Sequence, residues 1–314
     1  MSPILLRALA AATMTTALAG CVSLAPPYQR PQAPVPVQFG NAATAAGDPA
    51  LAMPAWREVF VEPRLQQVIA LALQENRGLR VAVLQVEKER AQYRIQRAAL
   101  LPSLDASGSV TRSRSRDATS ETGVSQVTEA DAVQVGISSW ELDLFGRIRS
   151  LKDEALQTWL ATEQTQRSTR MSLVAEVAGD WLTVGAYQQR LKLAEQTLAS
   201  QRESLALTKR RHEQGVMSGV DLASLQASVE SARADVAAYT TSLAQARNAL
   251  ELVVGAAVSD ALLPAARTGT TDAVALAPLS AEVSSAVLLQ RPDVLHAEHT
   301  LTAAHADTGP ASAA

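Results

Sequence analysis

Residues 222–253 decide the fold of this chain, and they read LASLQASVESARADVAAYTTSLAQARNALELV. Apolar or aromatic side chains recur in this stretch at alternating intervals of three and four residues, which is the 3.5-residue period of a coiled coil. A period sustained in this way predicts one long helix that packs against another helix along its length. The seam positions are Leu222, Leu225, Val229, Ala232, Val236, Tyr239, Leu243, Ala246, Leu250 and Val253.

The preceding segment repeats this period more loosely and predicts the partner helix. Proline is absent between residues 103 and 263, so a helix can run without interruption from about Arg147 to Glu213. At 1.5 Å per residue it would be on the order of 100 Å long, which few compact soluble domains need. Its seam positions are Tyr187, Leu191, Ala194, Leu198, Gln201, Leu205, Thr208 and His212.

A tight turn is predicted between the two helices. Gly215 and Gly219 permit a reversal of the chain, and Ser218 with Asp221 three residues later fits the N-capping pattern of a helix. The two helices are therefore expected to form an antiparallel hairpin. Because every such hairpin has a tip, these residues alone do not indicate a binding site.

The upstream chain predicts a shorter helix followed by a β-hairpin. The helix is expected from Pro63 to Ala99, stopping before Pro102. The period then changes to two in Leu104–Arg114 and Asp131–Ser139, where apolar residues alternate with small or polar ones. Segments of this length can cross a bilayer as tilted strands, although the same alternation occurs in water-exposed sheets. The polar connection between them would be an external loop.

The N-terminus has the composition of an export signal. Residues 1–20 carry an early Arg7 and then an uncharged run, which is typical of a secretory signal peptide. They end in Leu-Ala-Gly before Cys21, a pattern that resembles the bacterial lipobox, in which this cysteine is acylated. The alternative is an ordinary cleavage site followed by an incidental cysteine. The proline-rich residues 21–62 cannot be helical and are expected to extend over a surface as a leash.

Composition and motifs argue against several classes of protein. The 314 residues include 28 Lys plus Arg, 31 Asp plus Glu and one Cys, so neither a disulfide framework nor a nucleic-acid footprint is expected. The sequence contains no phosphate-binding loop, hydrolase elbow or metalloprotease pair, and we predict no enzyme and no cofactor beyond a covalent lipid on Cys21. His296, His299 and His305 could suggest a metal site, but a solvated helix end is the simpler interpretation, and no metal is predicted.

The run from Trp140 to Arg147, which reads WELDLFGR, is the most specific motif of the chain. Further motifs include the lipobox at Cys21, PYQRP at 27–31, RPDV at 291–294, and Arg211 with Gly215, Ser218 and Asp221. In their order along the chain these motifs resemble one family, the lipoprotein (NodT-type) branch of TolC-like outer membrane factors. The resemblance covers essentially the whole chain after the signal peptide.

This resemblance implies a mostly α-helical fold with a β-hairpin, in which helices form a periplasmic α-barrel and strands span the outer membrane. It implies a homotrimer, lipid-anchored in the outer membrane, that serves as the passive exit duct of a tripartite efflux system. A periplasmic adaptor would meet Arg211, Gly215, Ser218 and Asp221 at the hairpin tip, and an inner-membrane RND pump would select the cargo. The alternative is a periplasmic coiled-coil lipoprotein without a pore, or a fragment that at most binds an adaptor.

The chain departs from this family in its expected division into parts. After the helix at 63–102, the β-hairpin at 103–139 and the helical hairpin at 140–256, only residues 257–314 remain for a linker and a second copy of the unit. Residues 287–314 align with 72–99, so the chain stops just before a second β-hairpin. We therefore expect a truncated family member. Three copies would supply only about six strands, fewer than the roughly eight of the smallest common outer-membrane barrels.

Overall fold

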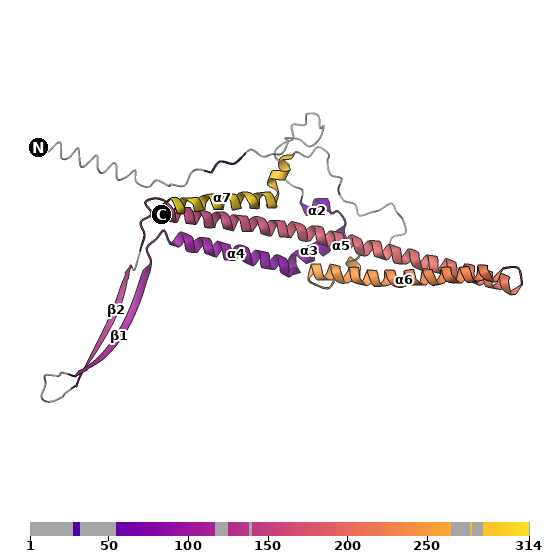
Figure 1. Cartoon of the computed structure of the whole chain (residues 1–314), viewed down its shortest axis with the longest axis horizontal. Helices are drawn as coiled ribbons and strands as arrows, with labels where there is room; N and C mark the ends of the chain where they lie inside the picture. Colours follow the sequence, from indigo (N-terminus) through magenta and orange to yellow (C-terminus); the bar gives the residue numbers. More distant parts are fainter. Residues whose placement is uncertain are drawn as a thin grey trace. The chain divides into compact units, whose positions relative to one another are not determined.

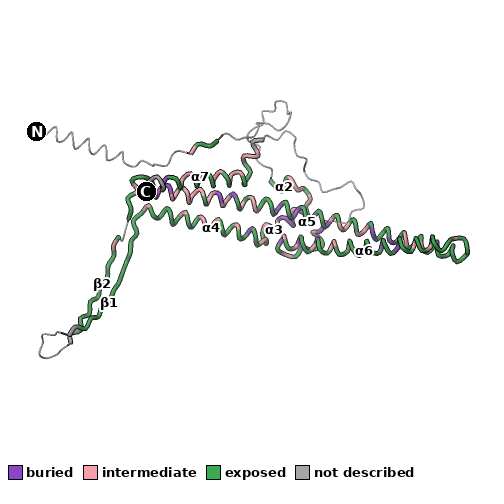
Figure 2. Tube along the Cα trace, in the orientation of Figure 1, coloured by how far each residue is buried: buried purple, intermediate pink, exposed green. Residues whose placement is uncertain are grey.

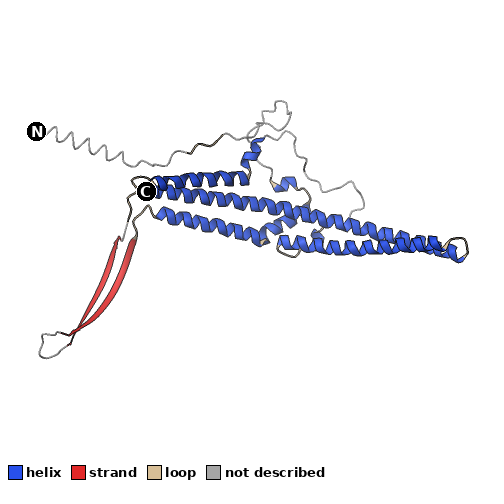
Figure 3. Ribbon diagram, viewed as in Figure 1, coloured by secondary structure: helices blue, strands red, loops and turns tan. Residues whose placement is uncertain are grey.

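The computed structural model describes residues 28–31, 55–116, 125–137, 140–264, 277 and 285–313. The expected signal peptide and Cys21 lie outside the described residues, as does most of the proline-rich segment. The fold is mostly helical with one antiparallel β-hairpin, as the sequence predicts (Figures 1 and 3). Its elements are α2 (Trp56–Val59), α3 (Pro63–Glu75), α4 (Arg77–Ala98), β1 (Leu104–Arg116), β2 (Ser125–Ile137), α5 (Arg147–Glu213), α6 (Gly219–Val254), η1 (Asp260–Leu262), η2 (Ser285–Gln290) and α7 (Pro292–Ala313).

The chain divides into two compact units. We call them the hairpin unit, which comprises residues 1–32, 86–162 and 296–314, and the core unit, which comprises residues 33–85 and 163–295. The hairpin unit contains both strands, the end of α4, the beginning of α5 and most of α7. The core unit contains α3, the tip of the helical hairpin and the largest group of buried apolar side chains.

The main hydrophobic core lies where α3, α5 and α6 pack together in the core unit. Leu65, Val68, Ile69 and Ala72 of α3 are fully buried, because intervals of three and four residues place them on one helical face. They pack with a group from α5 and α6 that includes Val177, Val184, Leu250 and Val254. Trp181 is also buried in this core, and its Nε1 donates a hydrogen bond to the carbonyl of Leu262 at 2.9 Å.

The predicted coiled-coil seam is confirmed along α6 (Figure 2). All ten seam positions between Leu222 and Val253 are buried or half-buried, while most residues between them are exposed. A second buried cluster joins Leu198 of α5 to Val229 and Ala232 of α6. The seam of α5 is confirmed from Tyr187 to Thr208. His212 is exposed, and its Nδ1 lies 2.8 Å from the carbonyl oxygen of Met217 in the turn.

The single helix predicted over Pro63–Ala99 is wrong, because the chain breaks at Asn76. This residue has an extended backbone, with ψ at 120°, and separates α3 from α4. Its Oδ1 accepts a hydrogen bond from the backbone N–H of Leu79 at 2.7 Å, which caps the start of α4. Its Nδ2 donates to the carbonyl of Val253 at 2.7 Å. The two hydrogen bonds of the Asn76 side chain thus compensate for the backbone hydrogen bonds that the break in the helix removes.

The expected bounds of the second strand and of the loop before it also differ from the structure. The second strand begins at Ser125 rather than Asp131, because thirteen residues of β1 pair one by one with β2 and extend the ladder to Arg116. The expected loop over 115–130 is correspondingly shorter. Helix α7 continues through Pro310 to Ala313. A proline this close to a helix end removes only one of the last backbone donors.

Gly255 should tolerate no side chain. It ends α6 with a φ of +82°, and a Cβ built there would lie 2.7 Å from the carbonyl oxygen of Glu75, where α3 ends. Gly255→Ala is therefore expected to lower the free energy of unfolding by at least about 2 kcal/mol. Gly179→Ala is the matched control, because Gly179 lies within α5 with no atom within 4 Å of its Cβ position.

The control should raise the free energy of unfolding by up to about 1 kcal/mol, since alanine favours helix over glycine. Urea titration of the detergent-solubilised protein, followed by circular dichroism, measures both changes. Equal stability of the two variants would contradict the close approach of α6 to the end of α3.

Candidate functional site

The β-hairpin has two chemically different faces. Its register pairs Leu104 with Ile137 at the base and Arg116 with Ser125 at the far end, and directly opposed residues share a face. One face carries the apolar residues Leu104, Ala106, Val110, Val133, Val135 and Ile137. The other carries Ser107, Ser109, Thr111, Ala132 and Gln134. This confirms the predicted split into one apolar face and one small or polar face.

The apolar face is open to the surroundings. Val133 is 88% exposed and Leu104 is 74% exposed. Towards the far end the same face becomes charged, where Arg112 Nε donates to Glu129 Oε1 at 2.8 Å across the strands. An apolar band that ends in charged pairs fits a strand that leaves a lipid layer.

Two carboxylates of the WELDLFGR motif hold the connection from β2 to α5. Glu141 pairs with Arg147, and Arg147 Nε donates to Glu141 Oε1 at 2.9 Å. The Asp143 side chain accepts hydrogen bonds from the backbone N–H groups of Ile148 at 3.3 Å and Arg149 at 3.0 Å. Asp143 therefore caps the first turn of α5, where a negative charge also complements the helix dipole.

Asp143 should make the free energy of unfolding depend on pH. Burial raises the pKa of its carboxyl group, but hydrogen bonds from Arg149 and Ile148 outweigh burial and hold the pKa below its ordinary value. A carboxyl group with a lowered folded-state pKa stabilises the fold above its unfolded pKa, and this contribution is lost as pH falls through the folded pKa. Asp143→Ala should cost about 1–2 kcal/mol at pH 7.

The measurement compares the free energies of unfolding of the wild type and Asp143→Ala from pH 7 down to pH 2.5. The difference between them should be constant above about pH 5 and should shrink below about pH 4, where the unfolded carboxyl group takes up its proton. Asp153→Ala is the control, because Asp153 is half-exposed and pairs only with the neighbouring Lys152. A difference that persists unchanged at pH 2.5 would argue against the cap.

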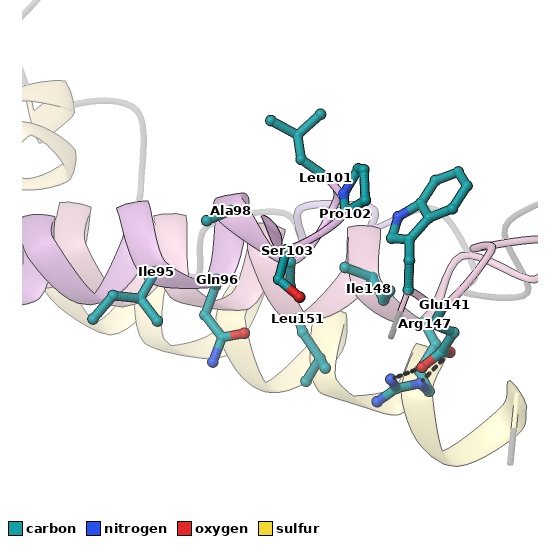
Figure 4. Close-up of a pocket in the computed structure, with 12 residues that line it drawn as sticks. Ile95, Gln96, Ala98, Leu101, Pro102, Ser103, Glu141, Arg147, Ile148 and Leu151 are labelled. Atoms are coloured by element: carbon teal, nitrogen blue, oxygen red, sulfur yellow. Dashed lines mark hydrogen bonds and ion pairs between the residues drawn. The ribbon is translucent and has the colours of Figure 1, made fainter. Parts of the chain in front are cut away.

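An apolar pocket lies at the base of the β-hairpin, within the hairpin unit (Figure 4). Its volume is about 970 Å³, and it is bounded by the end of α4, the residues that lead into β1, and the beginning of α5. Leu101 and Ile95 on its wall are 71% and 62% exposed, so it is an open groove rather than a closed cavity. The Glu141–Arg147 ion pair lies at its edge (Figure 4). This pocket was not predicted from the sequence, because its walls come from two stretches, 95–103 and 140–151, that are separated by the β-hairpin.

Of the four tip residues proposed from the resemblance, Ser218 and Asp221 contact each other, while Gly215 and the backbone of Arg211 belong to the turn that ends α5. Gly215 has a φ of +77°, its N–H donates to His212, and the N–H of Val216 donates to Arg211, which together close the end of α5 as a Schellman motif. Ser218 Oγ accepts from the Asp221 N–H at 3.1 Å and donates to Asp221 Oδ2 at 2.6 Å, which confirms the predicted cap of α6. The side chain of Arg211 is exposed.

Sequence analysis overlooked two exposed valines at this tip. Val216 and Val220 are 74% and 79% exposed on either side of the Ser218 cap. Large apolar side chains at the end of a helical hairpin indicate a contact surface, especially beside basic residues such as Lys209 and Arg210. The signal available in the sequence was valine placed between turn-forming glycines, where no helix seam requires it.

Two of the three α7 histidines, which the sequence places at a solvated helix end, also contact α5. His296 Nδ1 lies 3.1 Å from the carbonyl oxygen of Ala161, and His299 Nδ1 lies 2.8 Å from Gln157 Oε1. His296 remains exposed, whereas His299 and His305 are half-buried. Over the residues that the structure describes, no group of three His, Cys, Asp or Glu side chains could hold a metal ion.

Part of the proline-rich segment contacts α7. The Tyr28 ring meets the His305 ring edge to face, with ring centres 5.8 Å apart. Arg30 Nε lies 3.0 Å from Glu298 Oε1. Both contacts fall within the hairpin unit.

No helix in the described ranges is both long enough and apolar enough to cross a bilayer.

Comparison with known proteins gives consistent results. The family model described as outer membrane efflux protein matches residues 68–256. A probable efflux pump outer membrane protein, TtgC, from Pseudomonas putida is 42% identical over 312 residues, which is 98% of this chain and 64% of the relative. The cation efflux system protein CusC from Escherichia coli K12 is 38% identical over 301 residues, or 95% of this chain and 64% of the relative.

Solved structures show the same fold. A crystal structure of CusC superposes with a TM-score of 0.75 at 36% identity and covers 93% of this chain and 64% of its own. The open-state outer membrane channel MtrE from Neisseria gonorrhoeae gives a TM-score of 0.75 at 33% identity, with 93% of this chain and 63% of its own covered. The chain thus spans a little under two thirds of the length of the relatives it matches.

Proposed function

The chain belongs to the outer membrane efflux protein family, and on that basis we propose that it is a channel subunit of a tripartite efflux system. The observation that carries the proposal is the β-hairpin, whose thirteen-residue strands are long enough to cross a bilayer. Over the part of the ladder next to the base, the strands keep apolar residues on one face and small or polar residues on the other. The strands would lie in the outer membrane, and α5 with α6 would extend into the periplasm. The duct would be passive, and no residue is assigned a catalytic role.

The assembly would be a homotrimer that works with a periplasmic adaptor and an inner-membrane RND pump. In this arrangement the chain would divide into a signal peptide (1–20), a lipidated extension (21–62), a strand hairpin (103–139) and a helical hairpin (140–256). Acylation of Cys21 would anchor the N-terminus, and two or more acyl chains would make that anchorage stable. The names of relatives refer to toluene, antibiotics and cations, so cargo would be set by the pump rather than by the family fold.

The test is conductance together with oligomeric state. If the full chain, purified from outer membranes in detergent, migrates as a trimer and opens channels in planar lipid bilayers, the result supports the proposed duct. A monomer without conductance would support the alternative, a periplasmic coiled-coil lipoprotein that binds an adaptor without forming a pore.

The tip residues give a separate prediction. Arg211→Glu should weaken adaptor binding roughly tenfold without changing stability, because Arg211 is exposed at the tip and its charge would face the adaptor. Arg202→Glu is the matched control, an exposed arginine about two and a half turns further from the tip on the same helix. Pull-down of the purified adaptor at several salt concentrations measures the effect. If both variants lost adaptor binding equally, Arg211 would not be part of the proposed contact.

A further inference from the structure

We propose that the apolar pocket at the base of the β-hairpin holds one acyl chain of the lipid on Cys21. The proposal rests on the lipidation of Cys21 proposed above. It assigns an occupant to a pocket whose walls no other part of the described chain fills.

The leash is held on α7 by two contacts. Tyr28 packs against His305, and Arg30 pairs with Glu298, which lies two turns earlier on the same face of α7. Because residue 28 meets 305 while residue 30 meets 298, the leash runs antiparallel to α7. From Arg30 to Tyr28 the leash therefore advances towards the C-terminal end of α7.

That end of α7 lies at the level of the pocket. The contacts of His296 with Ala161 and of His299 with Gln157 show that α7 runs antiparallel to α5. Continuing the same register, one residue up α7 for one residue down α5, places His305 opposite about residue 151. Leu151 is part of the pocket wall.

The leash is long enough to reach the pocket from Tyr28. Cys21 lies seven positions before Tyr28, and an extended chain of that length spans at most about 25 Å. A helix with its side chains is about 10 Å across, so the leash can pass around α7 with length to spare. Cys21 can therefore stand at the pocket while Tyr28 stays on His305.

The pocket has the chemistry that an acyl chain requires. Its apolar walls come from Ile95, Leu101, Pro102, Trp140, Ile148 and Leu151. The exposed parts of Leu101 and Ile95 are apolar surface that a hydrocarbon chain would remove from water without needing a hydrogen bond. The volume of about 970 Å³ is at the upper end of the usual range for ligand pockets.

The test uses a photoreactive fatty acid, with a diazirine in the middle of its chain, fed to the bacteria that express the full-length protein. Outer membranes are irradiated, and the purified protein is digested and analysed by mass spectrometry. The expected result is a cross-link that joins the Cys21 lipopeptide to a peptide from residues 95–102 or 140–151 of the same chain. Mixing isotopically labelled and unlabelled chains separates cross-links within one chain from those between copies.

Two variants sharpen the test. Leu101→Asn should lower the cross-link yield roughly tenfold, because it replaces an apolar wall of the pocket with an amide. Leu252→Asn is the matched control, since Leu252 is even more exposed, lies on α6 and does not line the pocket. The double variant Tyr28→Ala, Arg30→Ala should also lower the yield, because it releases the leash from α7.

Other outcomes overturn the proposal in distinguishable ways. A lipidated Cys21 peptide that cross-links only to membrane lipid or to the strands would refute the pocket while leaving the channel proposal intact. Pocket peptides cross-linked to free phospholipid, or Cys21 cross-linked to another copy of the chain, would assign the pocket a different occupant. An unmodified Cys21 peptide would refute both this placement and the lipidation, whereas conductance would still test the channel.

Discussion

Arginine at position 133 is expected to keep the protein out of the outer membrane, whereas arginine at position 132 should be tolerated. Val133 lies on the apolar face of the β-hairpin, paired with Gly108 about a third of the way up the ladder, and is 88% exposed. A charged residue on the lipid-facing side near the bilayer centre costs about 2–4 kcal/mol. In three identical subunits that cost would be incurred three times.

Ala132→Arg is the matched control, because Ala132 is the neighbouring residue and points to the opposite, polar face of the hairpin. The measurement is the amount of each variant in purified outer membranes, with the trimer fraction determined alongside. Val133→Arg should be depleted at least about tenfold relative to Ala132→Arg. If both variants insert equally well, the apolar face does not contact lipid and the proposed duct has no support from the hairpin.

Loss of the Leu250 side chain is expected to cause the largest loss of stability in the core unit. Leu250 is fully buried where α3, α5 and α6 meet, and Leu250→Ala should lower the free energy of unfolding by about 2–5 kcal/mol through lost burial and the cavity left behind. Leu252→Ala should cost less than about 0.5 kcal/mol, because Leu252 is 81% exposed on the same helix.

Urea unfolding of the two variants, followed through the fluorescence of the buried Trp181, compares these costs directly. Both substitutions remove the same atoms from the same helix, so helix propensity changes equally in each. A similar cost for both would mean that burial does not determine the stability of this hairpin. In that case packing along the predicted seam would not contribute to the free energy of unfolding.

The tip and the beginning of α5 show how far local sequence patterns reach. Ser218 and Asp221 were predicted as a cap and form one, because an N-cap is made by residues three apart in sequence. The cap from Asp143 was not predicted, although it lies in the run that carries the family resemblance. Asp143 reaches over the turn at Gly146 to the N–H groups of Ile148 and Arg149, an interval that no simple capping pattern covers.

The strands were predicted in type and in the identity of their faces, but not in length. Each strand separately shows the alternation of apolar and polar residues with period two, and this alternation predicted which residues share a face. The start of β2 depends on β1, because pairing extends as far as both strands supply partners. Predicting each strand alone therefore placed the beginning of β2 six residues too late.

The order of residues by itself determined the helical hairpin, its bounds, its turn and the seam from Leu222 to Val253, because helix periodicity and capping are local properties. Tertiary structure alone decided the break at Asn76, the pocket below the strands and the histidine contacts of α7. Asn76 donates to the carbonyl of Val253, 177 residues further along the chain, and His299 meets Gln157 from 142 residues away. Contacts at such separations leave no regular spacing in the sequence, so only the packed helices reveal them.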